Sequence, residues 1–295
     1  MRTFFATALI FLFTIALISG CLKRDKPDTI ATEVINEGMS SNSEKVRLIF
    51  YNMYLPTEMS RLFEELGVNY MPEILNPSEN FSLYDDEPEI ALNLGLYGVD
   101  LSYCRLFDQN AETAKYFSTI QLLYGKLGIP PSYFHDLLTG LEQYYNNKDS
   151  LARFAGGVYE HADNFLRENN KDVYAAMIIT GGWIESIYLA SKIAEANPDN
   201  IEIKERIAEQ KYSLNSLISL LNNYQENYVV AGHLLMLKGL KKSFDQIDIY
   251  YKHDNFRLDT INKLFSVSDY NINFSPDLLK EISESISEIR SEIVN

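Results

Sequence analysis

The chain has 295 residues, of which 46% are hydrophobic and 23% charged, a balance that supports a sizeable core and argues against a disordered protein. Its formal net charge of −15 repels nucleic acid and anionic lipid headgroups, which excludes nucleic acid as a partner and disfavours binding to anionic lipid. Because no long run alternates apolar and polar residues, the composition favours an all-α fold of one large domain or two closely packed ones.

Residues 1–21 are typical of an export signal. One basic residue, Arg2, precedes an apolar run over 4–18, and the segment ends in LISGC. This ending is typical of a bacterial lipobox, in which Cys21 becomes the first mature residue and is acylated on its sulfur and its new amine, palmitate being one such acyl group. The alternative is an uncleaved membrane anchor, for which the apolar run is short. We therefore expect lipid on Cys21 to hold the chain to a membrane.

The next segment, 22–43, mixes charged residues with Pro27, Gly38 and a run of serines and is expected to be a flexible tether. The sequence LKRD directly after Cys21 has no aspartate in its first position. This indicates sorting to an outer membrane, with the protein facing the periplasm.

A helical domain is expected from residue 44 to residue 295, with an irregular connection at 68–86. Pro88 fits the first turn of a helix, and Gly128 fits the position that follows the end of another. The pattern predicts an array of about ten helices, which cover 46–54, 57–66, 88–107, 110–127, 132–145, 150–168, 172–196, 201–224, 229–250, 254–265 and 276–293.

The stretch 173–191 is the most apolar of these, VYAAMIITGGWIESIYLAS, and Glu185 is its one charged residue. A helix that is apolar on nearly every face is normally enclosed by others. We therefore expect the remaining helices, arranged as solenoid-like pairs in one version of the fold, to pack around a central helix at 173–196. The single tryptophan, Trp183, lies in this helix.

A second stretch, IALNLGLYGVDLSYC at 90–104, has the same character. In both stretches a tyrosine follows the acid three residues later, as Tyr103 follows Asp100 and Tyr188 follows Glu185. The similarity is compatible with a degenerate duplication of a helical unit and with coincidence among tyrosine-rich helices.

Glycine within a helix costs roughly 1 kcal/mol relative to alanine, so the glycines of these helices need a reason. The simpler reason is the close approach of another helix. The alternative is that Gly181 and Gly182 break the central helix and open a pocket floored by Trp183. The glycines in question are Gly95, Gly98, Gly181, Gly182, Gly232 and Gly239.

An acid on an apolar helix must be neutral, paired or solvated. Asp100 and Glu185 are therefore expected to pair with a base such as Arg105, Arg153 or Lys192, or to accept hydrogen bonds from tyrosines. The alternative is a ligand site. Its candidate residues would be Asp100, Tyr103, Trp183, Glu185 and Tyr188.

Other chemistry lacks its residues. The histidines are scattered and none has the spacing of a metal site, so neither a metal nor another cofactor is predicted. Cys104 is the one cysteine besides Cys21 and is expected to be a small core residue. His233, in the apolar run VVAGHLLML, is expected to be a core histidine rather than a base. No Gly-x-Ser-x-Gly motif is present, and no catalytic residue is predicted.

The lipobox, the acidic helical body and the motifs NLGLYGVDLSY at 93–103 and GGWIESIY at 181–188 together resemble uncharacterised lipoproteins of Bacteroidetes-type bacteria. The resemblance covers most of 44–250 and implies an envelope location and a helical fold, with no known activity. The expected function is that of a membrane-tethered binding or scaffolding protein with a possible protein partner in the envelope, more in keeping with a non-enzyme. The alternative is an enzyme or small-ligand-binding protein with its site near Asp100 and Glu185.

Overall fold

The computed structural model describes residues 31–32, 67–133, 162–163, 165–251, 256–259, 264–267 and 270–295. The chain divides into two units, Met1–Ile30 and Ala31–Asn295, and everything described belongs to the second. The expected signal and Cys21, the helices expected at 46–54 and 57–66 and most of those at 132–145 and 150–168 lie outside the described residues.

The described part is mostly helical, as expected. Its α-helices are α4 (Glu87–Leu106), α5 (Asn110–Lys126), α8 (Asp172–Ala196), α9 (Ile201–Glu209), α10 (Lys211–Leu221), α11 (Tyr228–Asp245) and α12 (Pro276–Val294). Short 3-10 turns occupy Pro72–Ile74, Ser78–Leu83, Pro131–Tyr133 and Asn222–Tyr224. The single helix expected at 201–224 is thus divided into α9 and α10, whose junction lies at Gln210.

The helix ends follow local chemistry. Asp86 caps α4 by accepting a hydrogen bond from the backbone N–H of Glu89, and proline lies in the first turn, as predicted. Ser275 caps α12 in the same way through the N–H of Leu278. Gly128 follows α5 with φ of +74°, a conformation that favours glycine.

The prediction of helix at 254–265 was wrong, because that region contributes strands. Strands β1 (Ala31–Thr32), β4 (Leu264–Val267) and β3 (Phe256–Asp259) form one antiparallel sheet, and β2 (Asp248–Tyr251) pairs with β5 (Tyr270–Asn273) in another. Aromatic and β-branched residues favour these strands, but each is too short for an alternating pattern to stand out. The helix predicted at 229–250 was too long, because α11 ends at Asp245 and strand β2 begins at Asp248. β1 lies within the segment expected to be a tether.

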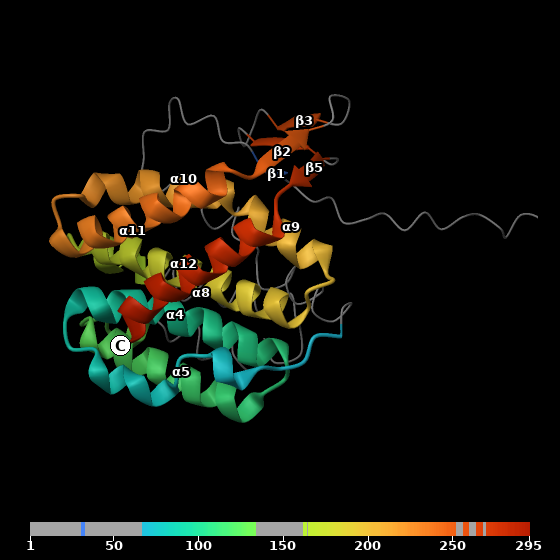
Figure 1. The fold of residues 1–295 in the computed structure, drawn as a ribbon. Coiled ribbons are helices and arrows are strands. Elements are labelled where there is room, and N and C mark those ends of the chain that lie inside the picture. Colours follow the sequence, from blue (N-terminus) through green and yellow to red (C-terminus); the bar gives the residue numbers. More distant parts are fainter. Residues whose placement is uncertain are drawn as a thin grey trace, which may run out of the picture. The chain divides into compact units, whose positions relative to one another are not determined.

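Helix α8 is the central helix that the sequence predicted. It packs against α4, α12, α9 and α10, and in Figure 1 it lies between α4 with α5 on one side and α10 with α11 on the other. By length and composition it is also the one helix of the described residues that could cross a membrane. However, 78% of its most apolar window is buried inside the fold, as expected of a core helix.

Helices α4 and α8 touch backbone to backbone. A Cβ atom added to Gly95 would lie 1.9 Å from the carbonyl oxygen of Ile178, and one added to Gly181 would lie 1.9 Å from that of Leu92. At Gly182 the nearest atom would be 3.5 Å away, an ordinary contact. Close approach therefore explains Gly95 and Gly181. The alternative that the glycine pair breaks the central helix is wrong, because α8 continues through both residues.

The remaining helical glycines have a different status. Cβ atoms added to Gly98, Gly232 and Gly239 would have no atom within 4 Å, so close approach of another helix among the described residues does not explain them.

The crossing can be tested by comparing two glycines of the same helix. We expect Gly95→Ala to push α4 and α8 apart and to lower the free energy of unfolding by roughly 1–3 kcal/mol or more. Gly98→Ala, three residues away in open space, should raise it by up to about 1 kcal/mol. Urea denaturation followed by circular dichroism measures both, and equal effects of the two substitutions would contradict the crossing.

Candidate functional site

The two acids of the apolar helices meet inside the fold. Contacts pair Leu92 with Gly181 and Gly95 with Gly182, so α4 and α8 run parallel at their crossing. One turn further along, Asp100 on α4 reaches Glu185 on α8, and their carboxyl groups share a hydrogen bond. Both side chains are fully buried. The structure thus brings together two candidate site residues that lie 85 positions apart in the chain.

The base that pairs with Glu185 comes from the last helix. Arg290 of α12 donates from Nε to Glu185 Oε2 at 2.6 Å and from Nη2 to Oε1 at 2.9 Å, a bidentate pair. Nη2 also donates to the carbonyl of Ile74 at 3.2 Å, and the guanidinium lies 4.1 Å from the centre of the Tyr188 ring. Planar, two-point pairing of this kind is the strongest form of an ion pair between side chains.

The bases proposed from sequence do not serve this role. Arg105 pairs with Asp108, and Lys192 pairs with Glu195. Arg153 lies outside the described residues. Arg290 was missed, although a signal was present: it lies four residues after Ile286 and three before Ile293, on the apolar face of α12.

Among the described residues, Asp100 has no base of its own. Its Oδ2 accepts a hydrogen bond from the backbone N–H of Asn76 at 3.2 Å, while Oδ1 is buried and takes no N–H donor from the described residues. Burial and the neighbouring negative charge of Glu185 raise the pKa of Asp100 well above its usual value. Two carboxyl groups that share a hydrogen bond need a proton between them, and Arg290 already holds both oxygens of Glu185. We therefore expect the proton to reside on Asp100, which would make the three side chains together electrically neutral.

Asn76, from the irregular connection expected at 68–86, links the acids to their surroundings. Its side-chain amide donates to the hydroxyl of Tyr84 at 3.0 Å and to Asn93 at 3.4 Å, and its carbonyl accepts from the hydroxyl of Tyr116 at 2.9 Å. Asn93 in turn donates to the carbonyl of Ile293, near the end of α12. This network is made of neutral groups that sequence patterns did not single out, because each is a common polar residue without a motif.

The other candidate residues lie around this centre with structural partners. The hydroxyl of Tyr103 accepts from the N–H of Met71 at 3.1 Å, and its ring stacks on Tyr70. Trp183 is fully buried and donates from Nε1 to Ser213 Oγ at 2.8 Å, so it does not floor an open pocket. Tyr188 contacts the acids indirectly, through Arg290.

The remaining reactive groups, Cys104 and His233, lie outside this centre. Burial raises the pKa of Cys104 to about 12, so its thiol stays protonated, in agreement with the predicted core role. His233 contacts the carbonyl of Val229 through Nδ1 at 3.0 Å. Within the described residues no three His, Cys, Asp or Glu side chains form a group that could hold a metal ion.

Comparisons with protein families, with curated proteins and with solved structures find no match for this chain. The geometry of the site therefore carries the functional argument by itself.

Two substitutions in the same cluster should differ sharply. Glu185→Gln leaves the guanidinium of Arg290 buried without its counter-ion, and breaking a buried pair in this way typically costs about 3–5 kcal/mol. Asp100→Asn keeps the shape and a donor toward Glu185, so it should cost less than about 1 kcal/mol. Urea denaturation at pH 7 measures both, and a similar large loss in each would show that Asp100 is ionised.

The pH dependence of stability gives an independent check. A folded-state pKa raised above the unfolded value of about 3.9 stabilises the fold below that pH, and this contribution is lost as the pH rises toward the folded pKa. Because asparagine does not titrate, Asp100→Asn does not lose stability in this way as the pH rises. Relative to the unmodified chain, the variant should gain up to about 1.4 kcal/mol per pH unit above pH ~4. Asp85→Asn, at an exposed position, is the matched control, and a flat difference for Asp100→Asn would contradict the protonated state.

Proposed function

We propose that the chain is a lipoprotein of the bacterial envelope, held to the membrane by acyl chains on Cys21. The observation that supports this is the sequence LISGC at 17–21, which follows an apolar run headed by a basic residue. Since Leu22 rather than aspartate follows the cysteine, we propose the outer membrane as its location, with the body facing the periplasm.

We further propose that the helical body is a scaffolding or protein-binding domain. In support, Glu185 is neutralised by Arg290 inside the fold. Burial raises the pKa of Asp100, so we expect this second acid to be neutralised by its own proton. Consecutive helices also pack as pairs, α4 with α5 and α10 with α11. A protein partner in the envelope would then bind the outer surface rather than this interior.

An enzyme or small-ligand-binding protein is the second candidate. It is favoured by the two neighbouring buried carboxyl groups, because acids whose pKa values are raised in this way gather at functional sites. The two proposals differ in what Glu185→Gln removes. A ligand site would lose a co-purifying small molecule at near-native stability, whereas a structural pair would lose stability with no change in bound molecules. Mass spectrometry of the purified protein together with its melting temperature separates them.

The anchor is tested by Cys21→Ser, which removes the sulfur that the first acyl chains require. We expect the variant to move from the membrane fraction to the soluble fraction and to lose its partition into detergent, because three acyl chains gain about 0.8 kcal/mol for each buried methylene. Cys104→Ser is the matched control and should stay with the membrane. If the Cys21 variant remained membrane-bound after removal of its leader, the anchor would be refuted.

A further inference from the structure

The outward face of α11 carries an unusual set of residues. Side chains along it are exposed at intervals of three or four, the spacing of one helical stripe. We call this stripe the α11 face. It consists of Tyr228, Ala231, Gly232, Leu235, Lys238, Gly239 and Lys242.

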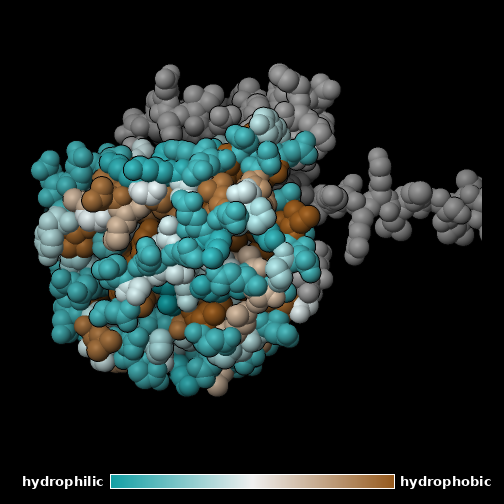
Figure 2. Space-filling model, in the orientation of Figure 1, coloured by the Kyte–Doolittle hydropathy of each residue, from teal (hydrophilic) through white to brown (hydrophobic). Residues whose placement is uncertain are grey.

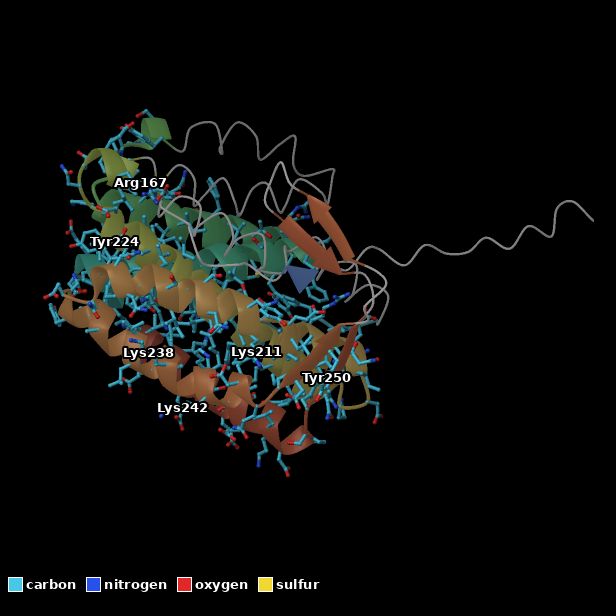
Figure 3. The ribbon with its side chains drawn as sticks, turned by 90° about the horizontal axis from the view of Figure 1, so that it is seen from above. Arg167, Lys211, Tyr224, Lys238, Lys242 and Tyr250 are labelled. Carbon is cyan, nitrogen blue, oxygen red and sulfur yellow. The ribbon has the colours of Figure 1, made fainter. Side chains whose placement is uncertain are left out.

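The α11 face is both apolar and basic. Tyr228 is 79% exposed and Leu235 is 73% exposed, among the most exposed large apolar residues of the described part. α11 has no acid before Asp245, and that acid is already paired with Lys241 at 2.5 Å. Lys238 and Lys242 lie one turn apart along α11 (Figure 3), although the chain as a whole carries a charge of −15. The α11 face is therefore suited to bind an acidic surface that also offers apolar contacts to Tyr228 and Leu235.

Such an acidic surface lies directly beside it, on α12. The two helices pack together, and Ser243 Oγ donates to Glu281 Oε1 at 2.6 Å. The outward face of α12, which we call the α12 face, is exposed and consists of Asp277, Lys280, Glu281, Glu284, Glu288, Ser291 and Glu292. Five of these seven residues are acids. Its internal ion pair, Lys280 with Glu284 at 3.6 Å, is exposed on both sides and thus contributes little.

The lysines of the α11 face and the glutamates of the α12 face lie at similar positions along the two neighbouring helices. α12 begins beside the C-terminal half of α11 and runs back in the opposite direction (Figure 1). Counting away from the contact between Ser243 and Glu281 on helices that run in opposite directions, Lys242 lies between the levels of Glu281 and Glu284, and Lys238 lies between those of Glu284 and Glu288. Figure 2 shows this side of the molecule, where hydrophobic residues lie among hydrophilic ones over α10 and α11.

We propose that a second copy of this chain binds here, with a two-fold axis running between α11 and α12. Rotation about that axis places the α11 face of each copy on the α12 face of the other, so the lysines meet the glutamates twice. An interface in which the same patch serves both subunits is the commonest form of protein self-association. Cβ atoms added to Gly232 and Gly239 would meet nothing within 4 Å in the described part of the chain, which leaves room for the approaching helix.

A second copy fits the charges better than a lipid surface does. An anionic membrane would attract the lysines of the α11 face but would repel the neighbouring acids of the α12 face, whereas a second copy offers acids to the lysines and lysines to the acids. A face two helices wide and about 27 Å long covers roughly 500 Å², which is small for a stable interface. The dimer should therefore be weak and dependent on concentration.

The test uses two differently tagged full-length chains expressed together and captured through one tag from detergent extracts. We expect the unmodified pair to co-purify. Lys238→Glu with Lys242→Glu in both chains should reduce recovery at least tenfold, and so should Glu284→Lys with Glu288→Lys in both chains, because each places like charges together. The mixed pair, one chain of each kind, restores both contacts and should recover the unmodified level. Light scattering then gives the mass of the complex.

Leu235→Glu provides an apolar test of the α11 face and should also prevent pairing. Leu122→Glu, on α5 and 49% exposed, is its matched control and should leave pairing intact. The proposal is overturned if unmodified chains do not pair, if pairing survives the charge reversals, or if the mixed pair is not restored. Binding of the α11 face to lipid vesicles by chains that do not pair would likewise overturn it. If Cys21→Ser chains still pair, the dimer is supported independently of the proposed lipid anchor.

Discussion

The structure depends on the contact between the backbones of α4 and α8. Gly95 and Gly181 let the two helices approach until carbonyl groups occupy the positions that side chains would otherwise take. The approach also fixes where the helices stand along each other, and this register places Asp100 opposite Glu185. The two buried acids therefore meet each other because of a single helix crossing, and they do not need two separate sites of burial.

The crossing would be unfavourable without Arg290. Two buried carboxylates repel each other, and one cation with one retained proton makes the group neutral. Arg290 is carried by the last helix, so the end of the chain completes a centre whose acids lie about 100 and 190 residues earlier. A buried ion pair adds little to stability relative to apolar packing. Its role here is to fix α12 against α4 and α8 in one arrangement.

The contact between α4 and α8 is also reciprocal. Gly95 meets Ile178 and Gly181 meets Leu92, and the separations from Gly95 to Gly181 and from Leu92 to Ile178 are both 86 residues. Such a pattern is what two copies of a helix related by a two-fold axis would make. The acids are separated by 85 residues, one fewer, so they depart from strict symmetry by one position.

Sequence alone was sufficient for the central helix and for the two acids as residues that needed partners, because an unbroken apolar run and a lone charge are local signals. The partner of Glu185 could not be assigned, since any of several bases could reach it and the helix that carries Arg290 is defined by long-range packing. The glycines were likewise equal in sequence, yet Gly95 meets a carbonyl and Gly98 meets nothing. The short strands after α11 escaped detection because their pairing partners, not their own patterns, make them strands.

The central claim is that a carboxyl proton persists in the interior at neutral pH. Infrared spectroscopy in heavy water measures this directly, because a protonated carboxyl group has a C=O stretching band distinct from that of a carboxylate. The account predicts that one such band remains at pH 7, disappears in Asp100→Asn and persists in Asp85→Asn. A spectrum at pH 7 in which every carboxyl group is ionised would contradict it.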